Sequence, residues 1–227
     1  MAVPKHLTEA ERDRVTAAVS AAEAGTDGEI VTIVTERSDP YHDVALHYAI
    51  GAMLFVAALA AVDPASIEAK IAWFSNGWSG APEPGRLFLA LMLIQALVFL
   101  VVRYALVWTP LRLTLTPRAT RSRRVRRRAV QYFKVGAERR TQARVGILLY
   151  LSLGERMAEI VADEAIHKAV PPERWGDAMA ALVAEVRHGR AGEGMAAAVA
   201  AIGAILAEGF PKTSDDVNEL PDRLIEL

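Results

Sequence analysis

The stretch from Leu87 to Arg128 constrains this chain most, because it joins an apolar run to a dense block of positive charge. The apolar run covers residues 87–102, and only the polar side chain of Gln95 interrupts it. Aromatic residues and Arg103 follow, and then the basic block. This order is typical of a helix that leaves a membrane on its cytoplasmic side. The block contains Arg121, Arg123, Arg124, Arg126, Arg127 and Arg128.

A second apolar run precedes this one, and together they predict a transmembrane hairpin. Residues 44–62 contain His47 as their only ionisable group and are long enough to span a bilayer. A buried helix of a soluble protein is the alternative for this segment. His47 fits an interfacial position better than a functional intramembrane one, and Arg103 can reach the interface with its long side chain.

The connection between the two runs, residues 63–86, is rich in proline and glycine and is expected to be a loop. Lys70 and Arg86 are its only positive residues, so the positive-inside rule places the loop outside and both termini in the cytoplasm. Amphipathic aromatic rings favour the membrane interface, which we expect on the outer side for three residues of the loop. These are Trp73, Phe74 and Trp78.

Charge is distributed unevenly although the formal net charge is only -1. Residues 103–144 carry 13 of the 26 Lys and Arg residues, against Glu138 alone, so this segment is the basic surface of the chain. The absence of cysteine excludes a disulfide framework and thiol chemistry. The first ten residues show no cleaved secretory signal.

The remaining segments predict an α/β domain. A capping box of Thr8 and Glu11 opens a helix, which a buried strand at residues 29–35 follows. After the hairpin the order is helix, two strands and two helices, and the last residues are expected to be a polar tail. The helix is expected at residues 119–140 and the strands at 144–153 and 156–163. The last two helices are expected at 175–187 and 195–208. In the first of these two, the side chains expected to be buried are Ala178, Leu182, Val183 and Val186.

Neither side of the hairpin is large enough to bury a core alone, so the first strand must pair with those beyond residue 144. The expected fold class is α/β, a small twisted sheet flanked by helices and split in sequence by the two-helix hairpin. The expected boundaries are 1–40 and 111–213 for the split domain, 41–110 for the hairpin and 214–227 for the tail.

This order of elements resembles the TPM domain family. The resemblance covers residues 7–38 and 119–209, and no single motif carries it. It includes Gly28 to Val31 at the first strand, Gly146 to Leu153 in the second, the tight turn into residues 157–163, and Trp175 with the glycines at 189–194. The chain looks like bacterial membrane members of the family, which implies the bacterial inner membrane, with the α/β domain in the cytoplasm.

The family includes acid phosphatases and assembly or modulating factors of membrane complexes, so the resemblance implies either activity. Many members have a glycine-rich turn after the third strand, where this chain has residues 163–167 instead, Asp-Glu-Ala-Ile-His. This departure weakens any transfer of metal binding or phosphatase activity.

Asp163, Glu164 and His167 are the best chemical candidates, because carboxylates and an imidazole can hold a divalent metal or transfer protons. The alternative is an exposed loop in which Asp163 caps a helix. No complete second set of ligands follows at a recognisable spacing, although Glu173 and Asp177 are placed in sequence to approach. Apart from that metal, no cofactor is expected. A second group is equally explained by helix capping beside the membrane: Asp39, His42 and Asp43.

Two motifs of catalysis are missing. Ser152 lacks the flanking glycines of a nucleophile elbow, and the glycines at 189–194 lack the lysine and Ser/Thr of a phosphate-binding loop. For the arginine block, anionic lipid headgroups are the favoured partner. An acidic protein partner in the membrane is an alternative, and nucleic acid is not expected because no aromatic platform is interleaved. The sequence thus favours an interaction or assembly module at the membrane surface, with a metal-assisted phosphatase as the alternative.

Overall fold

The computed structural model describes residues 6–74, 84–136, 145–171, 173–214 and 222–227. The chain divides into two compact units. We call residues 1–39 with 118–227 the sheet unit and residues 40–117 the hairpin unit. The hairpin unit is therefore inserted, in sequence, between the two parts of the sheet unit.

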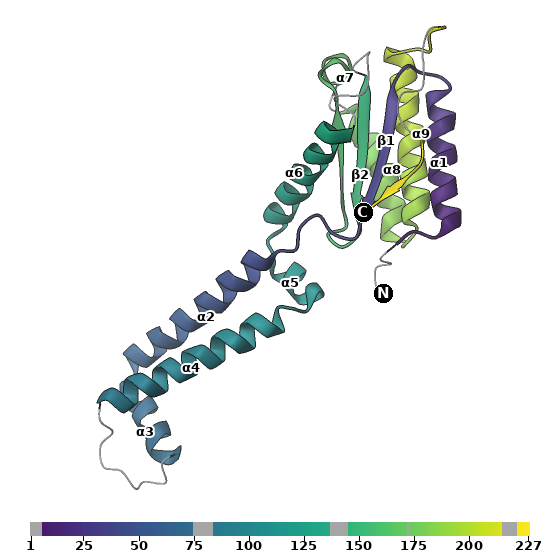
Figure 1. Cartoon of the computed structure of the whole chain (residues 1–227). Helices are drawn as coiled ribbons and strands as arrows, with labels where there is room; N and C mark the ends of the chain where they lie inside the picture. Colours follow the sequence, from purple (N-terminus) through teal and green to yellow (C-terminus); the bar gives the residue numbers. More distant parts are fainter. Residues whose placement is uncertain (1–5, 75–83, 137–144, 172, 215–221) are drawn as a thin grey trace. The chain divides into compact units, whose positions relative to one another are not determined.

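The sheet unit is built on a four-stranded sheet of order β3-β2-β1-β4 (Figure 1). Strands β1 (Glu29–Thr35) and β2 (Gly146–Ser152) are parallel, with Glu29 opposite Gly146 and Thr35 opposite Ser152. Strand β3 (Met157–Ala162) is antiparallel to β2 and follows it through a tight turn at Gly154 and Glu155, as the sequence predicts. The expected pairing of the first strand with strands beyond the hairpin is confirmed, and so is the α/β fold class.

The fourth strand, β4 (Ile225–Glu226), was not predicted and pairs in parallel with Ile33 and Val34 of β1. From sequence alone, this segment is expected to be part of a polar tail. Its apolar residues are too few to show a strand pattern, and only the edge of β1 gives them a partner. The end of the chain therefore completes the sheet.

Helices pack on both faces of the sheet (Figure 1). On one face, side chains such as Ile30, Val34 and Ile147 form a core with helices α1 (Glu9–Glu23), α8 (Arg174–Arg187) and α9 (Ala191–Gly209). On the other face, Val31 and Leu148 pack with helix α6 (Arg118–Gly136). Since successive residues of β1 and β2 point to opposite faces and both faces are covered, both strands are buried along their whole length.

Predictions made from local sequence are confirmed in α1 and α6. Thr8 and Glu11 form the predicted capping box, in which each side chain accepts a hydrogen bond from the other residue's backbone N–H. In α6, Val125, Ala129 and Phe133 are buried as the helical spacing predicts, and Tyr132 is partly buried against the same core. The prediction for Val183 on α8 is wrong, because its side chain is exposed rather than buried.

The glycines at 192 and 194 do not separate two helices, contrary to the sequence analysis, because α9 already begins at Ala191. A Cβ atom on Gly192 would lie 2.4 Å from Cβ of Glu11 in α1, and one on Gly194 would lie 2.8 Å from the backbone oxygen of Leu182 in α8. These glycines permit close helix packing. Within the described ranges, α9 is one of three helices long and apolar enough to cross a membrane, but it is largely buried in the sheet unit.

The hairpin unit consists of two long helices, α2 (His42–Val62) and α4 (Pro84–Ala105), which pack on each other. Both are long and apolar enough to span a membrane. Two short helices were not predicted: α3 (Pro64–Phe74) in the expected loop, and α5 (Thr109–Leu115) after α4. Trp73 is exposed on α3, whereas Trp78 and the side chain of Phe74 lie outside the described residues.

Candidate functional site: the arginine helix and the end of the sheet

A cluster of buried polar side chains lies where β1 and β2 end. The hydroxyl of Tyr150 lies 2.8 Å from Oγ1 of Thr35 and 2.9 Å from Oγ of Ser38. Tyr150 and Ser38 are almost completely buried, and burial raises the pKa of the Tyr150 hydroxyl above its usual value. The carboxyl ends of parallel strands are the common place for ligands in α/β sheets. Here the position between the strands is occupied by the protein's own hydroxyls.

Glu155 completes this cluster from the turn after β2. One carboxylate oxygen of Glu155 accepts a hydrogen bond of 3.0 Å from the backbone N–H of Ser38, and the other accepts one from the hydroxyl of Ser152. All three residues are at most 2% exposed. The cluster holds the chain after β1 against the turn after β2 and fixes where Asp39 emerges.

Two arginines of α6 bind the chain just after β1. Nη1 of Arg124 lies 2.7 Å from Oδ1 of Asp39, and Nε of Arg128 donates a hydrogen bond of 2.9 Å to the backbone oxygen of Ser38. The Arg128 guanidinium also lies 5.8 Å from the ring centre of Tyr132, within range of a cation–π interaction. We call Arg121, Arg124 and Arg128, which are all partly buried, the inner arginines.

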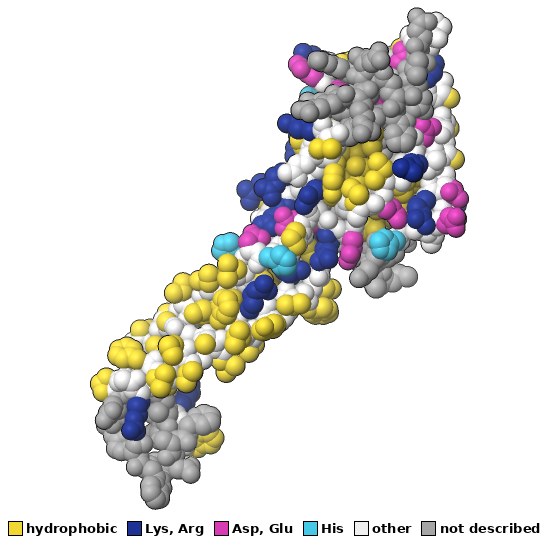
Figure 2. Space-filling view, in the orientation of Figure 1, with side chains coloured by type: hydrophobic (Ala, Val, Ile, Leu, Met, Phe, Trp, Pro, Cys, Tyr) yellow, Lys and Arg dark blue, Asp and Glu magenta, His cyan; other side chains and the backbone are white. Residues whose placement is uncertain are grey.

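We call the other three residues of the block, Arg123, Arg126 and Arg127, the outer arginines. All three are exposed. Their ion pairs are long: Arg126 lies 3.7 Å from Glu159, and Arg127 lies 3.9 Å from Asp39. Lys and Arg side chains gather over α6 in Figure 2. Exposed pairs of this length add little stability, so these charges are available to a partner.

Helical geometry explains this division. Positions 121, 124 and 128 recur at three- and four-residue steps and share one side of α6, next to the buried stripe of Val125 and Ala129. The outer arginines fall on the remaining sides. A continuous basic block in sequence is therefore two surfaces in the structure, one that holds the helix in place and one that is free to bind.

The structure places Asp163, Glu164 and His167 in one turn, but not around a common point. Asp163 is buried, and its Oδ2 accepts a hydrogen bond of 2.9 Å from the backbone N–H of Gly146 at the start of β2. Glu164 begins the short helix α7 (Glu164–Ala169) and forms an exposed ion pair with Lys168 at 2.6 Å. His167 is exposed.

Asp163 holds the N-cap position of α7 but makes no side-chain capping bond, because its carboxylate closes the sheet instead. Glu173 and Asp177 are exposed on or beside α8. Among the described residues, no three His, Asp or Glu side chains form a group that could hold a metal ion. The divalent metal and the catalytic role of these residues thus stay predictions.

The other candidates of the sequence analysis are also placed. Asp39 pairs with Arg124, whereas His42 and Asp43 are exposed in the first turn of α2. Sequence reasoning missed the cluster of Ser38, Tyr150 and Glu155. Tyr150 and Glu155 both lie more than 100 positions after Ser38 in the sequence. A serine before an aspartate carries no local signal of burial.

Comparisons with known proteins agree with this architecture. Residues 112–205 match the family model of the TPM domain. The structure of the BA42 protein from the psychrophilic bacterium Bizionia argentinensis, determined by NMR, is similar with a TM-score of 0.56. That alignment has 16% sequence identity and covers 100% of this chain and 99% of the other, and it shows a shared fold. No curated protein matches the chain.

Proposed function

The chain carries a TPM domain, and from this premise we propose that it is a membrane-anchored interaction or assembly module. In this proposal the hairpin unit lies in the bacterial inner membrane and the sheet unit works at its cytoplasmic surface. The family match begins at residue 112, within α5, so the matched part of the TPM domain follows the two long hairpin helices in sequence.

The observation that carries the proposal is the exposed apolar surface of the hairpin helices. No residue of α4 is buried, and large side chains such as Phe88 and Leu97 are 73% and 62% exposed. Figure 2 shows hydrophobic side chains covering this unit. Soluble proteins rarely expose a continuous apolar patch of this kind, whereas a bilayer buries it.

The distribution of charge supports the cytoplasmic orientation. The outer arginines follow the second span, and the connection between α2 and α4 carries few positive residues. Cytoplasmic flanks of membrane helices are enriched in Lys and Arg, so the hairpin would enter and leave on the same, cytoplasmic side.

Anionic lipid headgroups are the partner that the outer arginines suit best. Each basic residue near a negatively charged membrane surface contributes about 1 kcal/mol of attraction. A membrane protein with an acidic surface would use the same side chains. Nucleic acid fits less well, because Phe133 is buried and Tyr132 packs against Tyr150, so neither ring offers a stacking platform beside the arginines.

Metal-assisted phosphatase activity is the alternative that the resemblance suggests. Asp163, Glu164 and His167 would carry it, but Asp163 is engaged with Gly146 and the other two side chains are exposed. The interaction role therefore has the stronger physical support.

Single-cysteine labelling tests the anchoring and the orientation, because the chain has no native cysteine. Ser79 lies outside the described residues, and Ser122 is exposed on α6. We expect Ser79→Cys to react with a membrane-impermeant maleimide in intact cells, once the outer membrane is made permeable. Ser122→Cys should react only after the inner membrane is opened. The reverse pattern would invert the topology, and recovery of the chain in the soluble fraction would refute the anchor.

A further inference from the structure

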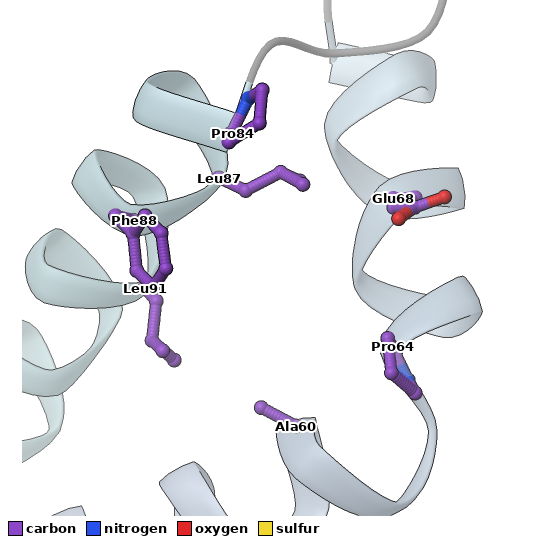
Figure 3. Close-up of a pocket in the computed structure, with 7 residues that line it drawn as sticks. All are labelled: Ala60, Pro64, Glu68, Pro84, Leu87, Phe88 and Leu91. Carbon is purple, nitrogen blue, oxygen red and sulfur yellow. The ribbon is translucent and has the colours of Figure 1, made fainter.

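A half-open cavity of about 250 Å³ lies on the hairpin unit, where α2, α3 and α4 meet (Figure 3). Ala60 lines it from α2, and Leu87, Phe88 and Leu91 line it from α4. In Figure 3 the side chain of Leu87 extends from α4 toward α3. The proposed docking surface of the arginines is on α6, so this cavity belongs to a different part of the chain.

Among the described residues of the lining, Glu68 of α3 is the only ionisable one. Its side chain is exposed, and no ion pair joins it to another described residue. An apolar cavity with one carboxylate at its entrance selects for an amphiphile whose apolar part is followed by a positive charge.

The size of the cavity indicates which apolar part fits. It is smaller than the roughly 300 Å³ at which pockets for drug-sized ligands begin. Part of one hydrocarbon chain is thus a better occupant than a whole ligand. An unfilled apolar cavity leaves its lining side chains without dispersion contacts, and lipid chains are the hydrocarbon available to a membrane hairpin.

We propose that this cavity binds an aminophospholipid, with part of one acyl chain between Leu87 and Ala60 and the ammonium group beside the Glu68 carboxylate. Lys70 and Arg86 lie within two residues of Glu68 and Leu87 in sequence, so the headgroup phosphate has cations in the same turns. The proposal rests on the proposed function, because it requires the hairpin to lie in a bilayer.

Native mass spectrometry of the full chain tests the binding. The protein is reconstituted in vesicles of equal phosphatidylethanolamine and phosphatidylglycerol, and then released in mild detergent. We expect one retained lipid, with phosphatidylethanolamine favoured about fivefold, the ratio expected for one exposed ion pair. Glu68→Gln should bring that ratio close to one while a lipid is still retained.

Two tryptophan variants separate the cavity from general lipid contact. Leu87→Trp fills the space and should abolish the retained lipid, whereas Leu93→Trp, at a residue 58% exposed on the same helix, should not. Equal retention of both lipids by the native chain, or an unchanged lipid ratio in Glu68→Gln, would refute the proposal. Recovery of the protein as a dimer that carries no lipid would also refute the proposal.

These failures differ from failure of the proposed function. If the chain fractionates with membranes but shows no lipid preference, only the lipid site is refuted. If the chain is not recovered in membranes, the anchor itself is refuted.

Discussion

Nη1 of Arg124 lies 2.7 Å from Oδ1 of Asp39, and this contact joins the last residue before the hairpin unit to the helix that follows it. Both side chains are less than one-fifth exposed, at 17% and 18%. Arg128 holds the neighbouring residue, Ser38, through its backbone oxygen. Within the sheet unit, the two points where the chain leaves for the hairpin and returns from it are therefore held together.

Loss of this pair should destabilise the sheet unit. We expect Arg124→Gln to lower the free energy of unfolding by about 1–3 kcal/mol, because the largely buried Asp39 carboxylate loses its closest cation. The matched control is Arg123→Gln, an exposed outer arginine on the same helix, which should change stability by less than about 0.5 kcal/mol. Thermal unfolding of the detergent-solubilised chain measures both. Equal effects of the two substitutions would show that Arg124 has no special structural role.

The outer arginines should control how α6 meets an anionic membrane. A spin label on Ser122→Cys should be less mobile in nanodiscs with anionic lipid than in zwitterionic ones, and high salt should reverse the difference. Replacing the three outer arginines with Gln should remove it. The charge-matched control replaces three exposed arginines elsewhere in the sheet unit and should retain it: Arg14, Arg174 and Arg190. A lipid-dependent signal that survives in the outer variant would contradict the docking role.

Glu23 should make stability depend on pH. It is buried in α1, and its Oε1 accepts a hydrogen bond of 2.7 Å from the backbone N–H of Ile30. Burial, with the neighbouring charges of Glu29 and Asp222, raises the pKa of Glu23 from 4.5 to about 8.

The folded chain thus keeps a proton that the unfolded chain releases near pH 4.5. The contribution of Glu23 to stability is complete below that pH and is lost as the pH rises toward about 8. Glu23→Gln removes this slope and should make the chain more stable at pH 7, by at most about 3 kcal/mol. Unfolding measured between pH 5 and 9 checks this, with Asp13→Asn, an exposed site on α1, as the control. An unchanged slope in Glu23→Gln would assign the pH dependence to other groups.

Two glycine substitutions should change the stability of the protein in opposite directions. Gly192→Ala places a methyl group 2.4 Å from Cβ of Glu11 and should cost about 1–3 kcal/mol of stability. Gly176→Ala in α8 meets no atom within 4 Å and should gain up to about 1 kcal/mol through helix propensity. The midpoint of thermal unfolding measures both. A neutral Gly192→Ala would show that α1 and α9 can separate without cost.

The phosphatase alternative has its own test. Hydrolysis of a phosphomonoester by the purified chain is measured with and without added divalent metal, in the native protein and in His167→Ala. Because His167 is exposed, this substitution should leave the fold intact. We expect no metal-dependent activity above background. Activity that requires metal and falls in His167→Ala would overturn the interaction role as the sole function.

Several elements were predictable because their signals are local. The β-branched run at 29–35 became β1 with the same bounds, and Thr8 and Glu11 formed their capping box. The apolar side of α6 and the length of the two hairpin helices follow equally from residue spacing. Each of these depends on neighbours within about one helical turn or one strand.

The failures share one physical reason, which is that distant residues decide them. The glycines at 192 and 194 resembled a linker until α1 and α8 were in contact with them. The hydrogen bond from the backbone N–H of Gly146 to Asp163 likewise joins positions far apart in sequence, and local sequence does not indicate it. Strand β4 has only two residues and depends on the free edge of β1.

The arginine block depends both on local sequence and on tertiary structure. By itself the sequence determined that residues 121–128 form a strongly basic helix after an apolar span, because charge and helical spacing are local properties. Which arginines bind inward was decided only by the tertiary structure. The pairing of β1 with β2 and the buried cluster around Tyr150 place Asp39 beside Arg124, while Arg123, Arg126 and Arg127 stay exposed.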